Sequence, residues 1–353
     1  MFALLIASMA CVPEQEIRSL NDPPPVTPTA ADLTGRVCDP TGYTWLEGAQ
    51  VYANLFDDDG AVMDVRMTTT DAEGYWTLLD VPAHYTVDVY VQKGSTIIEE
   101  HSLDLVADRL NEIEPPACLD PSTLDIIVVS GNYDDFDRVL EKMGINDYAS
   151  IDGRDQNELL SFLSSPEDMA EYDLIFFNGG FVEDGVIYDL KNPGNTDVVA
   201  VRANIKDFVV NGGNIYASDW AYDVVSQIWP GKVDFVGADE KPDAAQKGTS
   251  QSVNAAVNNN ALAEFMEMES PYTPIVYDLP VWPPVVATSA TVSNHLVANV
   301  EYREGDLVQT VTNSPLLISF NGGGGRVVYS SFRLVSNDDD DIIKVMKYVM
   351  FAL

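Results

Sequence analysis

Apolar and polar residues alternate along the first third of the chain. Between residues 33 and 116, segments such as AQVYANLF and YTVDVYVQKG change character at nearly every position. Turn sequences rich in Asp and Gly, at 57–60 and 71–74, separate these segments. Strict alternation predicts strands buried on one face, and short strands between such turns predict an all-β sandwich.

From residue 124 onward the pattern changes to short, continuous apolar runs. LDIIVVSG, YDLIFFNGG and NIYAS are typical of strands buried on both faces of a sheet. Between them, DDFDRVLEKMG, VVAVRANIKDFVVNGG and DWAYDVVSQIW carry apolar residues at helical spacing. PLLISF and RVVYSSF predict a hairpin around GGGG, and four aspartates at 338–341 begin a last helix. Strands that alternate with helices predict a three-layer α/β domain with a parallel sheet.

These patterns divide the chain into consecutive regions. Residues 33–118 form the expected sandwich and residues 122–353 the expected α/β domain. The helical pattern lapses at about 230–313, which predicts an insertion of strands and loops. Residues 12–32 include Pro23, Pro24 and Pro25, so we expect an extended tether there.

The N-terminus MFALLIASMAC is apolar but much shorter than a membrane-spanning helix. We interpret residues 1–11 as the end of a secretory signal peptide. They resemble a bacterial lipoprotein signal in having Ala10 before Cys11, and depart from it at Ser8 and Met9. The resemblance implies lipidation of Cys11 and a membrane as partner. The residue after this cysteine is Val12, and in this the sequence resembles lipoproteins of the outer membrane. The alternative is an ordinary cleaved signal peptide.

Two further cysteines flank the β-rich region, and none follows them. Cys38 lies in its first strand and Cys118 just beyond its last. We predict a disulfide between them, which would suit an exported protein. Two free buried thiols are the alternative.

The formal net charge of -37 indicates that the chain does not bind nucleic acid, because such binding begins with basic residues on phosphates. The weak metal candidates are Asp57, Asp58 and Asp59, three oxygen donors suited to Ca²⁺, but their spacing lacks the alternation of an EF-hand loop and we favour a solvated hairpin tip. The chain has no zinc-type ligand pair and no dinucleotide-binding glycine motif, so we expect no cofactor.

LTGRVCDPTG, GAQVYANL and TTTDAEGYWTLLDVPAHYTVDVYV resemble the carboxypeptidase regulatory-like sandwich, a transthyretin-like and Cna-B-like module. This resemblance implies a non-catalytic spacer or adhesion unit, in some relatives with carbohydrate binding. Trp45, Tyr75 and Trp76 are aromatic residues that can stack on a sugar or fill the sandwich core.

YDLIFFNGG, NGGNIYASDWAY and GGGGRVVYSSF resemble the class I glutamine amidotransferase-like family, with its flavodoxin-like fold and ThuA-like relatives. The resemblance implies an oxyanion-type loop at Gly179 and Gly180. The catalytic Cys and His of this family are both absent. The nucleophile turn reads Ala-Ser-Asp-Trp at 217–220, and Arg333 stands about where the histidine is common. Amide-nitrogen transfer is therefore not expected.

A serine hydrolase is the catalytic alternative. It would pair Ser218 with His295, the only histidine of the α/β domain, and Asp219, Asp223 or Glu301 would orient the imidazole. The fold implied by the resemblance brings the ends of neighbouring strands together in a cleft. The expected cleft residues are Asn178, Gly179, Gly180, Ser218, Asp219, Trp220 and Arg333.

The sequence thus predicts an exported, lipid-anchored binding or scaffolding protein of the cell surface or periplasm. Its partners would be the membrane, a carbohydrate or small anion, or another protein. The alternative is a hydrolase or sugar-processing enzyme that uses Ser218.

Overall fold

The computed structural model describes residues 30–38, 45–57, 59–93, 96–118, 124–237, 241–258, 260–265 and 271–351. The lipidation candidate Cys11, most of the expected tether and Asp58 lie outside this range. The first strand begins at Ala30, three residues before the predicted start of the β-rich region.

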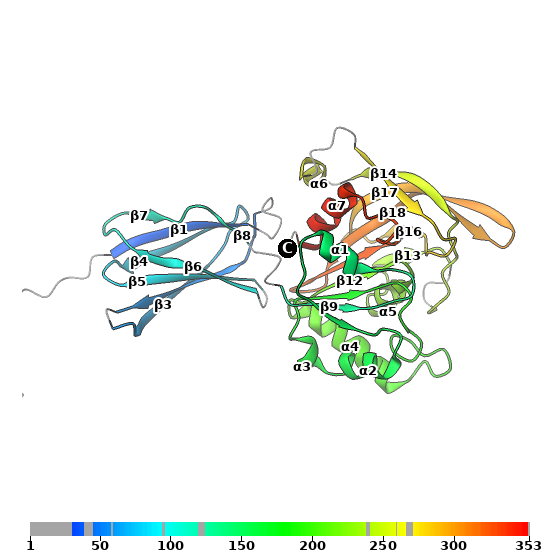
Figure 1. Cartoon of the computed structure of the whole chain (residues 1–353), viewed down its shortest axis with the longest axis horizontal. Coiled ribbons are helices and arrows are strands. Elements are labelled where there is room, and N and C mark those ends of the chain that lie inside the picture. Colours follow the sequence, from blue (N-terminus) through cyan, green and yellow to red (C-terminus); the bar gives the residue numbers. More distant parts are fainter. Residues whose placement is uncertain are drawn as a thin grey trace, which may run out of the picture.

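The N-terminal segment consists of two four-stranded sheets (Figure 1). In one, β1 lies between β4 and β7, and β8 also pairs with β1; the other has the order β3-β2-β5-β6. The strands are β1 (Ala30–Cys38), β2 (Gln50–Phe56), β3 (Val62–Thr69), β4 (Tyr75–Pro82), β5 (Thr86–Lys93), β6 (Thr96–Asp104), β7 (Leu110–Glu112) and β8 (Ala117–Cys118).

The alternation of the sequence determines which side chains enter the core between these sheets. Val51, Ala53 and Leu55 of β2 are fully buried, as are Val87 and Val89 of β5. Residues of β1 and β4 complete the same apolar cluster from the other sheet. Successive side chains of a strand point to opposite faces, so every second residue faces this core.

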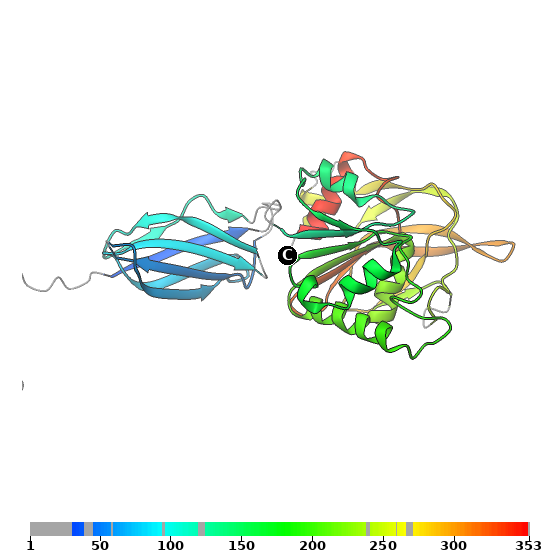
Figure 2. The same ribbon diagram turned by 60° about the horizontal axis from the view of Figure 1, so that its bottom comes forward.

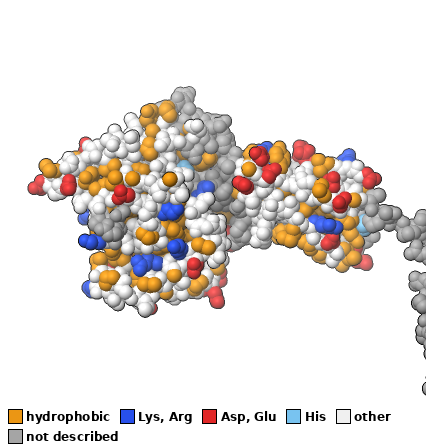
Figure 3. All heavy atoms as spheres, turned by 180° about the vertical axis from the view of Figure 1, so that it is seen from behind, with side chains coloured by type: hydrophobic (Ala, Val, Ile, Leu, Met, Phe, Trp, Pro, Cys, Tyr) orange, Lys and Arg blue, Asp and Glu red, His pale blue; other side chains and the backbone are white. Residues whose placement is uncertain are grey.

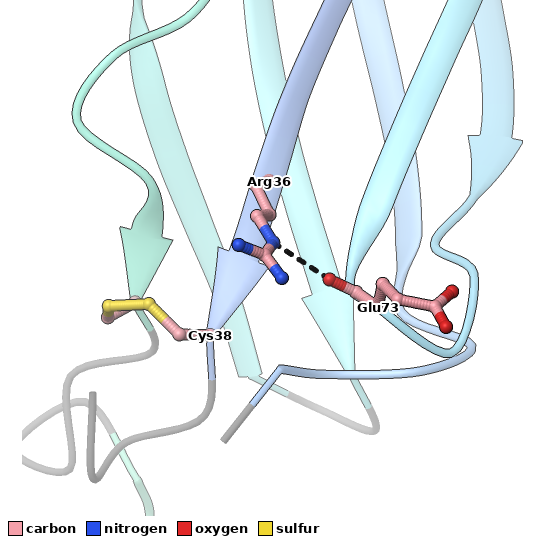
Figure 4. Close-up of a disulfide and its surroundings, with 4 residues drawn as sticks. Arg36, Cys38 and Glu73 are labelled. Carbon is pink, nitrogen blue, oxygen red and sulfur yellow. Dashed lines mark hydrogen bonds between the residues drawn. A yellow bond between two sulfur atoms is a disulfide. The ribbon is translucent and has the colours of Figure 1, made fainter. Parts of the chain in front are cut away.

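The predicted disulfide is confirmed. β1 and β8 run parallel with Cys38 opposite Cys118, and the two Cα atoms are 4.3 Å apart. Cys118 lies within β8 and not beyond the last strand. Figure 4 shows the bond at the end of β1, two residues beyond Arg36.

The C-terminal segment is built on one nine-stranded sheet of order β10-β9-β11-β12-β19-β18-β17-β14-β15. The first five strands are parallel to their neighbours, and the remaining pairings are antiparallel. The strands are β9 (Ile126–Val129), β10 (Ala149–Ile151), β11 (Leu174–Phe177), β12 (Asn214–Ser218), β14 (Gln251–Val257), β15 (Tyr272–Tyr277), β17 (Ser293–Glu304), β18 (Leu307–Asn321) and β19 (Arg326–Ser330). β13 (Val233–Phe235) and β16 (Val285–Thr288) form a separate pair.

Helices cover both faces of the large sheet (Figure 2). The buried residues of α1 and α7 join one apolar cluster, and those of α2 to α5 join another on the opposite face. The helices are α1 (Phe136–Lys142), α2 (Gln156–Leu163), α3 (Pro166–Met169), α4 (Thr196–Val210), α5 (Tyr222–Ile228), α6 (Asn260–Phe265) and α7 (Asp340–Phe351). The strands between these layers are buried on both sides, which is why they read as continuous apolar runs.

The predicted parallel sheet is confirmed only in part, because the large sheet is mixed. The expected insertion at about 230–313 contributes β14, β15, β17 and the first part of β18, and these strands extend the main sheet as antiparallel neighbours. β17 and β18 turn back on one another through Gly305, whose φ of 62° suits a residue without a Cβ. A turn this short can join only antiparallel strands, because parallel ones need a long crossover.

Candidate functional site

The carboxyl ends of β9, β11, β12 and β19 meet at one edge of the large sheet. Phe177 lies opposite both Val129 and Ala217, and Ser218 lies opposite Ser330. The residues that follow these strands are therefore neighbours, although they are far apart in the sequence. This edge holds most of the residues predicted to line a cleft.

Asp219 forms the apex of the turn after β12. Its φ is 49°, in the left-handed region, whereas Ser218 before it is extended at a φ of -121°. Non-glycine residues adopt this conformation mainly when they are Asn or Asp. The predicted helix over 219–229 accordingly opens with a 3₁₀ turn (Asp219–Ala221) before α5.

The side chain of Asp219 is enclosed at this turn. The residue is 1% exposed, and its Oδ1 has no hydrogen-bond partner among the described residues. Burial, and then the charge of Asp134, raise the pKa of Asp219 well above its usual value, while Arg333 acts in the opposite direction. Asp219 therefore favours the neutral, protonated acid.

Gly179 makes room for this turn. A Cβ at position 179 would lie 3.0 Å from the Cβ of Asp219 and 3.1 Å from the backbone oxygen of Ser218. A glycine therefore favours this close packing, which is a structural reason for part of the motif YDLIFFNGG.

Ser218 is fully buried and hydrogen-bonded in two directions. Its Oγ accepts a hydrogen bond from the Gly179 N–H at 3.2 Å, and its hydroxyl also bonds to the carboxylate of Asp134. The Gly179 N–H is thus directed at Ser218, and the oxyanion role implied for Gly179 is wrong for this arrangement.

Asp134, which the sequence reasoning missed, connects three parts of this edge. Its carboxylate accepts hydrogen bonds from the N–H groups of Leu334 at 3.1 Å, Val335 at 2.9 Å and Asp135 at 3.0 Å, besides the Ser218 hydroxyl. Burial raises its pKa, and these hydrogen bonds lower it. Asp134 therefore ties the loop after β19 to β9 and β12. The acidic run after the first apolar strand was the available signal.

His295 does not meet Ser218, so the Ser–His pair that the catalytic alternative requires is not formed. His295 lies on β17 and forms a hydrogen bond of 2.8 Å between its Nε2 and the Oγ of Ser319 on β18. Two strands, β19 and β18, separate β17 from β12, which places the imidazole roughly 14 Å from Ser218 at the usual strand spacing. Burial lowers the pKa of His295 to about 4, so it is neutral at physiological pH.

The proposed orienting residues are also used elsewhere. The Asp223 carboxylate accepts hydrogen bonds from the Asp243 N–H at 2.8 Å and the Ser226 hydroxyl at 3.0 Å. Glu301 is exposed on β17 and holds Thr249 through its backbone oxygen at 3.0 Å. These contacts of Asp223 and Glu301 do not include His295.

Arg333 lies at the expected edge, but its charge is already paired. Its Nη2 contacts the carboxylate of Asp278, and its Nη1 donates to the backbone oxygen of Tyr133 at 2.8 Å. Its side chain is only 13% exposed. Asp278 neutralises the guanidinium, so Arg333 does not offer an unpaired charge to the small anion expected as a partner.

Asn178 and Gly180 complete the edge. Asn178 is 1% exposed, and neither its Oδ1 nor its Nδ2 has a partner among the described residues. Gly180 has a φ of 88°, and a Cβ there would come within 2.5 Å of the Tyr133 ring. Tyr133, which is 44% exposed, thus covers this glycine at the rim.

A second acidic group lies beside Trp220. The Nε1 of Trp220 donates to Asp243 at 3.2 Å, and Asp243 is joined through its backbone to the buried Asp223. Burial raises the pKa of Asp223 to about 6, and burial followed by the charges of Asp223 and Asp243 raises that of Glu183 well above its usual value. Glu183 is 6% exposed, and its Oε1 has no partner within the part of the chain that the structure describes. Polar residues inside the apolar pattern of 219–229 were the only signal for this group.

The metal and sugar candidates of the N-terminal segment have local structural roles. Oδ1 of Asp57 accepts hydrogen bonds from the N–H groups of Asp59 at 3.0 Å and Ala61 at 2.9 Å, which closes the hairpin turn. Across the described ranges, no three His, Cys, Asp or Glu side chains are placed to hold a metal ion together.

The Arg36 guanidinium packs against Trp45 and Tyr75, two of the aromatic residues that can stack on a sugar. Its guanidinium carbon lies 3.2 Å from the ring centroid of Trp45 and 4.4 Å from that of Tyr75. The Nε of Arg36 also donates to the backbone oxygen of Glu73 at 2.8 Å (Figure 4). Trp76 is 3% exposed and belongs to the core. Arg36 therefore covers one face of each partly exposed ring.

None of the described helices combines the length and the apolar character needed to span a bilayer.

Several solved structures are similar to this chain. The chain matches no protein-family model and no curated protein. It is similar to a putative ThuA-like protein from Bacteroides uniformis, at 11% identity over 63% of this chain and 88% of that one, with a TM-score of 0.40. It is also similar to a cytoplasmic protein from Salmonella typhimurium, at 13% identity over 60% and 87%, with a TM-score of 0.35. PurLQS from Thermotoga maritima aligns at 15% identity over 64% and 97%, with a TM-score of 0.35.

Proposed function

We propose that this protein is an exported, lipid-anchored binding protein of the cell surface or periplasm. It has two domains in this proposal. A carboxypeptidase regulatory-like sandwich carries an amidotransferase-like, ThuA-like α/β domain that has lost acyl-transfer chemistry. The two sheets around one core in the N-terminal segment, and the separate clusters on the large sheet, support this division.

The observation that carries the proposal is the bonding of Ser218. A serine nucleophile needs a base that can remove its proton and an oxyanion donor free to receive substrate. Ser218 instead bonds to Asp134 and to the Gly179 N–H, and His295 is engaged with Ser319. The turn that would present a nucleophile presents the buried acid Asp219.

Neutral carbohydrate is the ligand class that suits this edge best. The unpaired atoms of Asn178, Asp219 and Glu183 are buried, so they make the interior beneath this edge polar but do not themselves contact a ligand. Tyr133 and Trp220 are partly exposed at the rim and offer aromatic surface for a sugar ring. The surrounding carboxylates and the paired Arg333 disfavour an anion.

Calorimetric titration of the full chain with neutral oligosaccharides tests the binding. Trp220→Ala and Tyr133→Ala should each weaken binding about tenfold, because each removes one stacking face. Tyr272→Ala is the matched control, since Tyr272 is an equally accessible tyrosine, 55% exposed, on β15. Failure to bind any neutral sugar, or equal effects of all three variants, would contradict the assignment.

A sugar-processing enzyme that uses Asp219 as a general acid is the second candidate. The specific observation is a buried carboxyl of raised pKa at the turn apex, since such an acid can protonate a leaving oxygen. Release of reducing ends from a bound oligosaccharide, abolished in Asp219→Asn and retained in Ser218→Ala, would favour this candidate over pure binding. Loss of turnover in Ser218→Ala would instead restore the serine hydrolase.

A further inference from the structure

Strand β3 forms an open edge of the N-terminal segment. It pairs with β2 and with no other described strand, so its outer backbone groups face away from the sheet (Figure 1). Natural proteins usually protect such edges with charged residues, prolines or bulges, because an open edge pairs readily with another strand.

β3 carries one such device, because its register with β2 shifts between Leu55 and Phe56 and leaves Met63 as a bulge residue, but its apolar side chains remain exposed. Val62, Met63, Val65 and Met67 are 53%, 52%, 47% and 65% exposed, respectively. Figure 3 shows hydrophobic side chains along the lower edge of the N-terminal segment, the edge that β3 forms. In a chain whose formal net charge is -37, a strand with one acidic and one basic residue is locally neutral. The strand therefore lacks the like-charge repulsion that opposes contact between two copies over most of this surface.

The order of residues in β3 is self-complementary about Val65. Asp64 and Arg66 flank this residue, and Met63 and Met67 flank that pair. If two copies of the strand run antiparallel with Val65 at the two-fold axis, each Asp64 faces the other copy's Arg66. The bulge residue Met63 then lies near the other copy's Met67. Alternation over residues 64–67 directs Asp64 and Arg66 to one face and Val65 and Met67 to the other.

The neighbouring strands extend this apolar face. Tyr52 on β2 lies opposite Met67, and Tyr90 on β5 lies opposite Tyr52. The two tyrosine rings stack with their centroids 5.1 Å apart. Pairing of two β3 strands would therefore join two such rows into one continuous surface across an eight-stranded sheet.

We propose that β3 is a homodimer interface, in which two copies of this protein pair antiparallel through their β3 edges about Val65. Charge complementarity selects this occupant. Asp64 and Arg66 already form an ion pair of 2.9 Å within one chain, and antiparallel self-pairing gives each a second opposite charge. A parallel, in-register pairing would place like charges opposite one another.

Sedimentation equilibrium of the full chain, with Cys11→Ser in every variant, tests the dimer. The apparent mass should rise from one chain toward two with concentration. Met67→Lys should weaken association about tenfold or more, by placing lysines beside the axis. Leu307→Lys is the matched control, because Leu307 is also 65% exposed but lies on β18. Its association should equal that of the parent chain.

A charge exchange tests the register. Asp64→Arg and Arg66→Asp should each weaken the dimer, because each places like charges opposite one another, and the double exchange should restore it. Val65→Cys should form a disulfide-linked dimer under mild oxidation, since the two copies of residue 65 lie on the axis. Thermal unfolding of each variant shows that its monomer remains folded.

Three outcomes would overturn the interface. A chain that stays monomeric up to high micromolar concentration has no such dimer. Equal effects of Met67→Lys and Leu307→Lys would place any association elsewhere. A double exchange that fails to restore a dimer lost in both single variants would exclude antiparallel pairing about Val65.

Discussion

The Ser218 hydroxyl accepts a hydrogen bond from the Gly179 N–H at 3.2 Å, so the residue at the expected nucleophile turn and the glycine of the expected oxyanion-type loop are bonded to one another. The Ser218 hydroxyl also bonds to Asp134. The segments YDLIFFNGG and NGGNIYASDWAY thus act as packing elements at this edge. A glycine suits position 179 because Asp219 packs against it.

Ser218→Ala should destabilise the protein by about 1–3 kcal/mol, because it leaves the buried Gly179 N–H without an acceptor and removes one donor from Asp134. Urea unfolding measures this loss. Ser293→Ala, at an exposed position that begins β17, should change stability by less than about 0.5 kcal/mol. Equal stability of the two variants would contradict a structural role for Ser218.

Asp219→Asn should stabilise the protein at neutral pH. Burial and the charge of Asp134 raise the pKa of Asp219, so the folded state holds its proton more tightly than the unfolded chain. The stability contributed by this group is therefore complete below the unfolded pKa, roughly 3.9, and is lost as pH rises through the folded value. Asparagine cannot ionise and tolerates the φ of 49°.

Unfolding curves of the Asp219 variants between pH 4 and 7 test this prediction. The advantage of Asp219→Asn over the parent chain should shrink toward pH 4. Asp219→Ala should be less stable than Asp219→Asn by about 1 kcal/mol, since alanine adopts the left-handed conformation poorly. An Asn variant that is less stable than the parent at pH 7 would indicate that the ionised carboxylate is needed.

Removal of the disulfide should destabilise the N-terminal segment strongly. Cys38 and Cys118 are 80 residues apart in sequence, and the entropy of closing a loop of this length corresponds to about 4–5 kcal/mol. The double variant Cys38→Ser, Cys118→Ser should unfold at lower denaturant concentration and become insensitive to reductant. A parent chain whose unfolding is unchanged by reductant would contradict this stabilisation.

The chain should partition into detergent and incorporate labelled palmitate if Cys11 is lipidated. Cys11→Ser should release it to the soluble fraction, because a single remaining apolar run of this length cannot hold it in a bilayer. Cys38→Ser serves as the control that retains the anchor. A parent chain that is soluble with Cys11 intact refutes lipidation.

The sequence by itself was sufficient for several local and covalent features. The alternation in AQVYANLF identified β2 and its inward residues, and the apolar runs LDIIVVSG and YDLIFFNGG identified β9 and β11. The positions of Cys38 and Cys118 at the ends of the β-rich region identified the bond between them. Such features depend on the period of neighbouring residues, which a sequence displays directly.

Only the tertiary structure decided the order of the large sheet and the partners at its edge. The sequence contained β14, β15 and β17 but did not reveal that they continue the parallel strands, because pairing depends on contacts between distant segments. For the same reason it could not separate His295 from Ser218 or bring Asp134 to the Ser218 hydroxyl. The left-handed turn at Asp219 packs against Gly179, and strand register and backbone conformation together determine which side chains meet there.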